Sequence, residues 1–281
     1  MGACDFHTPI SPRAGKDIIK KAWKNGIKAF DTAFSYNNAD SMLYSAMREL
    51  QVERTDYEIW SKVMPLPTMR KKIETSRRRL GSDYFDLLML HWPIDDESLF
   101  SSLKTLESLK NENITREIGV SNFPLPLLKR VMNDFQISFH ERPLSLIWNK
   151  DWKEEEELSI NTIAYSPGGF GLLSGKYSSA TPPEDERKNI KAFSSPLFPQ
   201  LLESIQKLAE KYNTTSYSVA ISWVVSMAPW AIVRGVGKEE ELEIKTPSLT
   251  EKEIDELTAI ADEISLSYTS DNIFSHNWML R

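Results

Sequence analysis

Four side chains that could together carry out acid–base chemistry stand at or just after the ends of short apolar runs: Asp31, Tyr36, Lys62 and His91. A tyrosine, with an ordinary pKa of about 10, gives up its proton slowly at neutral pH, but an adjacent ammonium group favours the phenolate. A carboxylate would keep that lysine charged, and a histidine could donate a hydrogen bond to a carbonyl oxygen. The set predicts proton donation to a carbonyl, although each residue alone also has a structural explanation: an ion pair, a loop aromatic, a strand cap.

These residues need a scaffold that gathers the ends of several strands. Residues 84–90, YFDLLML, are apolar except at Asp86, which indicates a strand buried on both faces, as in a parallel sheet covered by helices. His91 follows this strand directly. Further strands are predicted at residues 27–31, 57–63, 117–123, 142–148, 160–167 and 231–235.

Helical patterns separate the predicted strands. Apolar residues recur at helical spacing in residues 15–25, 40–50, 69–80, 99–109, after Pro124, and in 199–212, 216–227, 238–245 and 250–264. This alternation predicts an α/β protein of repeated βα units, with residues 1–4 as the tail of a first strand. We therefore expect a single domain over residues 1–281, a (β/α)8 TIM barrel whose strand ends meet at one mouth.

The composition fits such a barrel and excludes several classes of function. The chain has 281 residues, 41% of them hydrophobic, and a net charge of −6, which disfavours nucleic acid and anionic membranes as partners. The single cysteine, Cys4, excludes an intramolecular disulfide and a cysteine-cluster metal site. Neither a signal peptide nor an apolar run of membrane-spanning length is evident, so a cytoplasmic location is expected.

Two polar segments interrupt the pattern. Residues 174–195 contain Pro182 and Pro183 and show no periodicity, and a loop of this length predicts a functional lid. The acidic run Glu154–Glu157 is interpreted as the solvated face of a helix.

Five motifs follow one another along the chain: FDTAFSY (30–36), SKV (61–63), RRRLGSDYFDLLMLHWP (77–93), IGVSNF (118–123) and AYSPGGFGLLSGKY (164–177). In this order they resemble the aldo-keto reductase superfamily, over nearly the whole chain. The resemblance implies a (β/α)8 barrel, here without the N-terminal hairpin common in the family, that uses NADP(H) to reduce an aldehyde or ketone, such as a sugar or another small carbonyl. It also implies that Asp31, Tyr36, Lys62 and His91 form the catalytic tetrad, with Tyr36 as proton donor.

The resemblance also assigns cofactor residues. Ser121 and Asn122 match the pair that holds the nicotinamide carboxamide, and Tyr165 matches the aromatic residue on which the nicotinamide ring stacks. The family's usual glutamine on the next strand aligns with Ser145, whose shorter side chain cannot make the same contact. The loop expected near the pyrophosphate includes Ser166, Gly169, Gly171, Leu172 and Ser174, and the adenosine end is expected at Arg234, Lys238, Glu241 and Lys245.

The residues at the adenosine end predict NADPH rather than NADH as cofactor. Guanidinium and ammonium groups are good partners for a 2′-phosphate, although Glu241 would repel it. NADH is the second candidate. Met64, Trp92 and Trp278 are candidate walls of the substrate pocket.

Two other functions compete with carbonyl reduction. A regulatory or scaffold protein of the same fold would bind the cofactor with little turnover; the complete tetrad argues against it, and the changes at Ser145, Glu241 and Lys245 argue for it. A metal-dependent barrel hydrolase would need clustered ligands, and the four histidines, His7, His91, His140 and His276, show no such spacing.

Overall fold

A computed structural model describes residues 10–36, 38–65, 67–94, 96–178 and 180–266. The chain divides into two compact units, which are described separately. Unit 1 comprises residues 1–141 and 233–243, and unit 2 comprises residues 142–232 and 244–281. The expected strand at residues 1–4 and the candidate pocket residue Trp278 lie outside the described residues. Whether the chain is a single domain stays a prediction.

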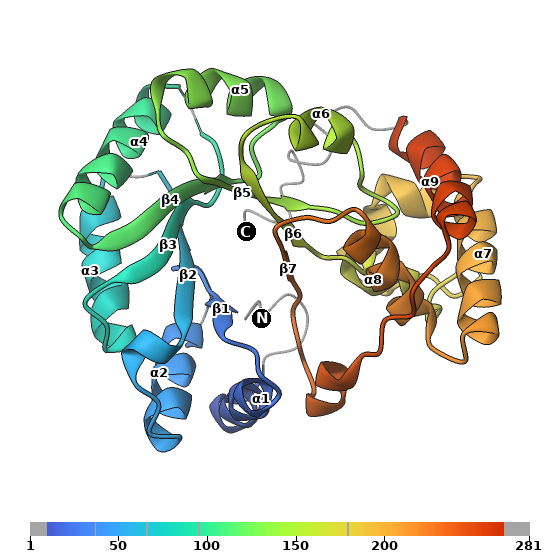
Figure 1. The fold of residues 1–281 in the computed structure, drawn as a ribbon, viewed down its shortest axis with the longest axis horizontal. Coiled ribbons are helices and arrows are strands. Elements are labelled where there is room, and N and C mark those ends of the chain that lie inside the picture. The colour runs from blue at the N-terminus through green and yellow to red at the C-terminus, as the bar shows by residue number, and fades with distance from the viewer. Residues whose placement is uncertain (1–9, 37, 66, 95, 179, 267–281) are drawn as a thin grey trace. The chain divides into compact units, whose positions relative to one another are not determined.

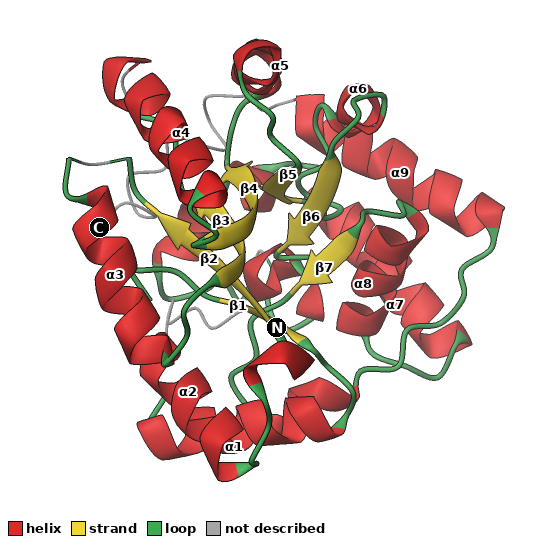
Figure 2. Ribbon diagram, turned by 60° about the vertical axis from the view of Figure 1, so that its left-hand side comes forward, coloured by secondary structure: helices red, strands yellow, loops and turns green. Residues whose placement is uncertain are grey.

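Unit 1 is built from parallel strands that alternate with helices (Figure 1). Each strand pairs in parallel with the next along the chain, from β1 to β5. In Figures 1 and 2, α3 and α4 lie on the outer side of this part of the sheet. The elements are α1 (Pro12–Lys24), β1 (Ala29–Asp31), α2 (Ala39–Glu49), β2 (Glu58–Val63), α3 (Met69–Leu80), β3 (Phe85–Leu90), α4 (Asp96–Asn111), β4 (Thr115–Ser121), α5 (Leu125–Asp134) and β5 (Phe139–Pro143).

The strand β3 confirms the prediction made from its apolar run, because all six of its residues are buried. Asp86, its one charged residue, is neutralised by two guanidinium groups: Arg54 Nη2 lies 2.6 Å and Arg116 Nη1 lies 2.9 Å from its carboxylate oxygens. The same carboxylate accepts a hydrogen bond from the Ile59 amide of β2. A buried charge with these partners is tolerated within an apolar strand.

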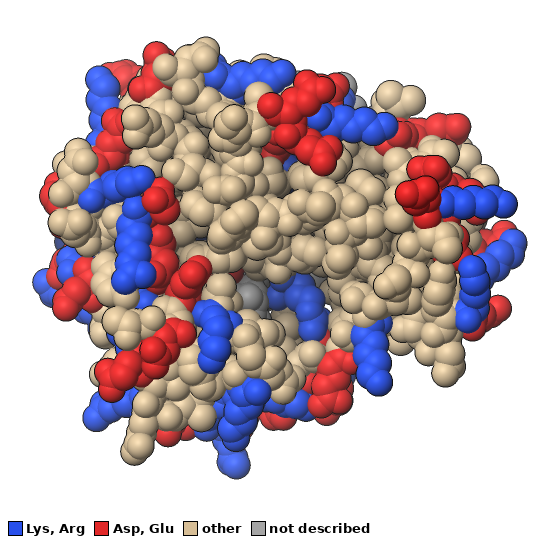
Figure 3. All heavy atoms as spheres, viewed as in Figure 1, with Lys and Arg blue, Asp and Glu red and all other residues tan. Residues whose placement is uncertain are grey.

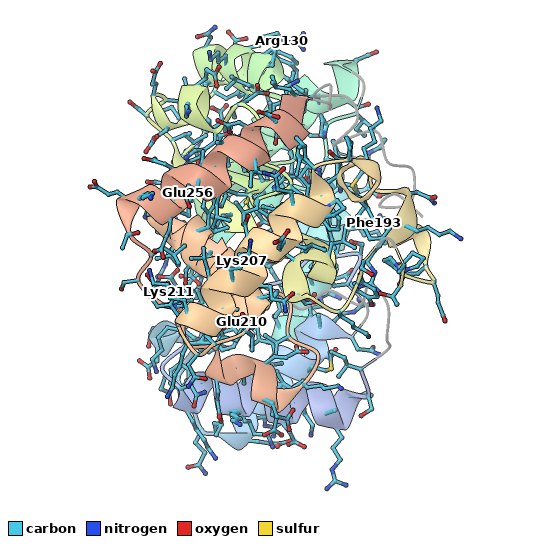
Figure 4. The ribbon with its side chains drawn as sticks, turned by 90° about the vertical axis from the view of Figure 1, so that its right-hand side faces the viewer. Arg130, Phe193, Lys207, Glu210, Lys211 and Glu256 are labelled. Carbon is cyan, nitrogen blue, oxygen red and sulfur yellow. The ribbon has the colours of Figure 1, made fainter. Side chains whose placement is uncertain are left out.

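Unit 2 encloses its own apolar core. The helices α7 (Phe198–Lys211), α8 (Ser216–Ser226) and α9 (Glu251–Leu266) contribute to it, with Phe198 and Trp223 fully buried. The opposite faces of α7 and α9 are polar and carry Lys207, Lys211 and Glu256 (Figure 4). The remaining elements are α6 (Trp152–Glu156), β6 (Asn161–Tyr165), most of β7 (Ala231–Val233), and short 3₁₀ helices at Gly169–Ser174, Glu186–Asn189 and Lys191–Ser194.

The connectivity is that of the predicted barrel class. The strand order of the sheet follows the chain order from β1 to β7, which is the order that successive βα units produce. Lysine and arginine side chains are interspersed with aspartate and glutamate on the face drawn in Figure 3. Within the described part of the chain, no helix is both long and apolar enough to cross a membrane.

The predicted strand at residues 142–148 is wrong. The strand β5 covers Phe139–Pro143, and the apolar residues after it turn back, with the backbones of Ser145 and Trp148 bonded to each other at 2.8 and 3.0 Å. Hydropathy misplaced the strand because β5 buries three polar residues in a row, His140, Glu141 and Arg142. The apolar run that follows packs in the core of unit 2 without being extended.

Two smaller expectations also need correction. Glu155 is not on a solvated helix face: it is buried and pairs with the buried Arg142, with 2.7 Å between Glu155 Oε2 and Arg142 Nη1. The expected helix at 238–245 is a 3₁₀ helix, Glu239–Glu243. Within residues 174–195 two short 3₁₀ helices form, and the lid function of this segment stays a prediction.

Candidate active site

Backbone hydrogen bonds join the carboxyl ends of β1, β2 and β3. Thr32 N donates to Trp60 O at 2.8 Å, Phe34 N to Lys62 O at 3.1 Å, and His91 N to Val63 O at 2.9 Å. Parallel pairing therefore delivers the side chains that follow these strands to one edge of the sheet in unit 1.

At this edge the structure brings together the four residues that the sequence singled out. Lys62 Nζ donates to Asp31 Oδ2 at 2.5 Å, and both side chains are buried. Lys62 Nζ also lies 5.4 Å from the centre of the Tyr36 ring. The rings of Tyr36 and His91 meet edge to face, with centroids 5.7 Å apart and planes at 79°. The phenol thus lies between a buried ammonium and an imidazole.

Sequence reasoning missed a fifth member of this cluster, Glu141. Its carboxylate lies 3.1 Å from Lys62 Nζ, and Glu141 is only 3% exposed. The side chain comes from β5, where Glu141 is paired with Ser121 of β4. No hydropathy signal marks this strand in the sequence, because three of its five residues, His140, Glu141 and Arg142, are polar and buried.

Burial and neighbouring charges shift the pKa values of His91, Lys62 and Glu141. Burial, together with the nearby Lys62 charge, lowers the pKa of His91 to about 3, so its ring is neutral and offers one N–H donor. Burial opposes the charged form of Lys62, but Asp31 and Glu141 outweigh it and raise the pKa of the ammonium. Burial and the negative charge of Asp31 raise the pKa of Glu141, against the opposing effect of Lys62.

Replacing Glu141 with glutamine should flatten the pH dependence of stability. The pKa of Glu141 rises from 4.5 to about 8 on folding, so between these values the folded protein holds a proton that the unfolded chain has lost. The free energy of unfolding must therefore fall as pH rises through this window, by up to about 1.4 kcal/mol per pH unit. Glutamine keeps the side-chain size and removes the ionisation, so the slope should shrink.

Urea unfolding of both proteins at several pH values across the window measures this effect. A matched control is Glu117→Gln, because Glu117 pairs with Lys110 and its pKa is lowered rather than raised. That variant should keep the wild-type slope. Equal slopes for wild type and Glu141→Gln would show that Glu141 is ionised in the folded protein at neutral pH.

Ser121 and Asn122, the residues predicted to hold the nicotinamide carboxamide, connect the ends of β3, β4 and β5 through hydrogen bonds. Asn122 Nδ2 donates to His91 O and to Ser121 Oγ, both at 3.0 Å, and Asn122 N donates to Glu141 O at 2.9 Å. Asn122 adopts a left-handed backbone conformation, with φ of 64°, which asparagine tolerates better than most residues. These bonds fix the amide beside the tetrad.

The loop predicted near the pyrophosphate is a tight turn in unit 2. It follows Tyr165, the last residue of β6, and passes through left-handed conformations at Ser166, Gly169 and Gly171. Leu172 is fully buried and anchors the loop, and Ser174 Oγ donates to Gly171 O at 2.6 Å. Ser145, also in unit 2, is buried, and its hydroxyl accepts a bond from Ile147 N.

The residues predicted at the adenosine end divide between the units. In unit 1, Arg234 Nη2 donates to Glu241 O, whereas Arg234 Nη1 is buried and has no partner among the described residues. The Glu241 carboxylate accepts from Gly237 N at 2.8 Å, and Lys238 is exposed beside it. Lys245 belongs to unit 2 and is exposed.

A pocket of about 450 Å³ in unit 1 reaches the tetrad at Lys62 and His91. Met64, predicted as a pocket wall, lines it. Trp92, the other described candidate, is 7% exposed, and its ring centroid lies 6.4 Å from that of His91. Among the described residues, no group of three or more His, Cys, Asp or Glu side chains is arranged to hold a metal ion.

Comparison with known proteins decides the family. The family model "Aldo/keto reductase family" matches residues 1–262. The chain belongs to this family. A methylglyoxal reductase of Salmonella typhi is 32% identical over 223 residues, which cover 74% of this chain and 72% of the relative. An aldo-keto reductase of Strobilurus tenacellus is 24% identical over 276 residues, which cover 88% of this chain and 80% of the relative.

Solved structures confirm the fold of this aldo-keto reductase. A glycerol dehydrogenase from Gluconobacter oxydans superposes with a TM-score of 0.78 at 24% identity, over 92% of this chain and 88% of that chain. The holo form of an aldo-keto reductase from Bacillus halodurans gives 0.75 at 19% identity, over 92% and 90%. The predicted (β/α)8 class is thereby confirmed, and family membership makes the protein an oxidoreductase of carbonyl groups.

Proposed function

We propose that this aldo-keto reductase uses NADPH to reduce an aldehyde or ketone to the alcohol, with Tyr36 as proton donor. The observation that carries the proposal is the packing of Tyr36 against His91 and Lys62, with Lys62 bonded to the buried Asp31. A positioned acid, a cation that stabilises its conjugate base and a neutral hydrogen-bond donor are what reduction of a carbonyl requires of the protein.

Each residue has one task in this mechanism. Tyr36 gives its phenolic proton to the carbonyl oxygen. Lys62 stabilises the phenolate that remains, because its ammonium lies 5.4 Å from the ring centre. Asp31 holds the ammonium charged and in place at 2.5 Å. His91, neutral at every physiological pH, donates an N–H to the carbonyl oxygen and orients it toward the phenol. NADPH, when bound, supplies the hydride.

The described residues fit a phosphate-bearing cofactor. Arg234 Nη1 is a buried cationic donor without a partner among them, and such a group is stabilised by an anion. Arg234 and Lys238 would hold the 2′-phosphate that distinguishes NADPH from NADH. The Glu241 carboxylate is engaged by the Gly237 amide, which partly satisfies its charge. In unit 1, Ser121 and Asn122 would hold the nicotinamide carboxamide. The assignment of Tyr165 and of the loop through Ser174, in unit 2, stays a prediction.

The relatives suggest small carbonyl substrates. Besides the Salmonella protein, a glyoxal reductase of Bacillus subtilis is 25% identical over 260 residues. We infer that dicarbonyls and simple aldehydes are the first compounds to test. Met64, which lines the pocket, is placed to contact them, whereas the buried Trp92 is not among the residues that line it.

Carbonyl-dependent oxidation of NADPH and NADH by the purified protein tests the proposal. Two samples of cofactor are deuterated at nicotinamide C4 on opposite faces, and one of the two should leave deuterium on the former carbonyl carbon of the product. The KM for NADPH should lie below that for NADH. Equal KM values for the two cofactors would contradict the NADPH assignment. Tight cofactor binding without turnover of any carbonyl would instead favour a cofactor-binding regulatory protein.

A further inference from the structure

The pocket that reaches the tetrad has one strongly basic wall. It runs from Lys62 and His91, past Phe34 and Met64, to the helix α3, which lies beside α2 in Figures 1 and 2. Three cations of α3 line it: Lys71, Lys72 and Arg79. All three are exposed, so their charges are accessible to a ligand in the pocket.

The basic residues of α3 fall into two groups. Those that do not line the pocket have carboxylate partners: Arg70 pairs with Glu112, Arg78 with Glu74, and Arg77 with both Glu74 and Asp83. For Lys71, Lys72 and Arg79, in contrast, no carboxylate of the described chain lies within ion-pair distance. Positive charge without a protein partner is therefore concentrated on the wall of the pocket.

The acidic residue in the same pocket does not cancel this charge. Asp40 is 4% exposed, and its two carboxylate oxygens accept hydrogen bonds from Thr32 Oγ1 at 2.9 Å and Ser76 Oγ at 2.5 Å. Burial raises the pKa of Asp40, against the opposing effects of these two hydrogen bonds and of the nearby Arg79 charge, and this single carboxylate faces three cations. The hydroxyl group of Thr68 adds a further hydrogen-bond donor to the lining, whereas the Thr75 hydroxyl donates to Lys71 O at 2.9 Å.

We propose that the enzyme selects carbonyl substrates that carry a carboxylate or phosphate group, held by Lys71, Lys72 and Arg79 while the carbonyl lies beside His91 and Tyr36. The inference rests on the proposed function. A cavity of about 450 Å³ is larger than a two- or three-carbon carbonyl needs and has room for a chain between the two groups. Phe34 and Met64 provide an apolar wall for that chain.

Matched substrate pairs test this inference. 4-Oxobutanoate is compared with butanal, and glyceraldehyde 3-phosphate with glyceraldehyde. In at least one pair, the kcat/KM of the anionic compound should exceed that of the neutral compound by about tenfold or more. The difference should lie mainly in KM, because a charge-assisted contact contributes about a tenfold gain in binding. Preference in only one pair distinguishes a carboxylate site from a phosphate site. No preference in either pair would overturn the inference.

Charge reversal on α3 provides a second test of the proposed anion site. The Lys71→Glu/Lys72→Glu variant should lower the ratio of kcat/KM between the anionic and neutral members by about tenfold or more. A matched control, Lys104→Glu/Lys129→Glu, changes two exposed lysines of unit 1 that do not line the pocket, and it should keep the wild-type ratio. An unchanged ratio in the α3 variant would contradict the assignment.

The binding of 4-oxobutanoate, followed by calorimetry, separates failure of this inference from failure of the proposed function. If no carbonyl is reduced, the proposed function fails, and the inference still predicts that wild type binds 4-oxobutanoate more tightly than butanal and that the α3 variant loses the difference. Equal binding of the two compounds would overturn it. Reduction of neutral aldehydes without any anion preference would overturn the inference alone.

Discussion

Replacing Lys62 with methionine is expected to lower kcat/KM for carbonyl reduction by about 10²- to 10⁴-fold, the range typical for loss of assisted proton transfer. Methionine retains the length of the buried side chain and removes its charge. Without the ammonium 5.4 Å from the centre of the Tyr36 ring, the phenolate that proton donation leaves behind is less stabilised, so the proton is transferred more slowly.

The Lys62 variant also changes the charge balance of the buried cluster. Asp31 and Glu141 lose the cation that both contact, so an ionised carboxylate in the buried cluster is left without its compensating charge. Some stability will be lost, and activity should therefore be expressed per mole of folded protein, counted by NADPH binding. The control Lys110→Met removes a half-buried partner of Glu117 and should leave kcat/KM unchanged. Wild-type kcat/KM in Lys62→Met would remove Lys62 from the mechanism.

The tetrad could be predicted from the sequence because its members lie where regular patterns end. The all-buried run before His91 and the short run before Asp31 mark strands without reference to their neighbours. Parallel pairing then requires the residues at those ends to share an edge. The same argument predicted the position of Lys62, which is the next-to-last residue of β2.

Glu141 could not be found in this way because its strand is not apolar. The side chains of β5 are buried through pairing: Phe123 N donates to His140 Nε2 at 3.3 Å, Glu141 contacts Lys62, and Arg142 contacts Glu155. Hydropathy cannot register partners that are distant in sequence, so the strand was placed on the apolar residues that follow. The burial of Glu155 escaped prediction for the same reason, because Arg142 is its partner.

The basic wall of the pocket could not be predicted from the sequence either. The run of cations in α3 is evident in the printed sequence, but which of them are neutralised depends on Glu112, from another helix, and on the rotation of α3 about its axis. Only the packed structure separates Arg70, Arg77 and Arg78 from the three cations that line the pocket.

The central claim, that Tyr36 is the proton donor, is tested most directly by the turnover of Tyr36→Phe. Phenylalanine keeps the ring that packs edge to face on His91 and removes only the hydroxyl, so the fold and NADPH binding should persist. The hydroxyl of Tyr44, a partly exposed residue of α2, provides the matched control, and Tyr44→Phe should behave like wild type.

Single-turnover reduction of a carbonyl substrate by NADPH-loaded wild type, Tyr36→Phe and Tyr44→Phe is the measurement to make. We predict that Tyr36→Phe reduces the substrate about 10²- to 10⁴-fold more slowly than the other two proteins, with a nearly unchanged Kd for NADPH. A Tyr36→Phe protein that reduces the carbonyl at the wild-type rate would contradict the account, because the proton would then have to come from another group.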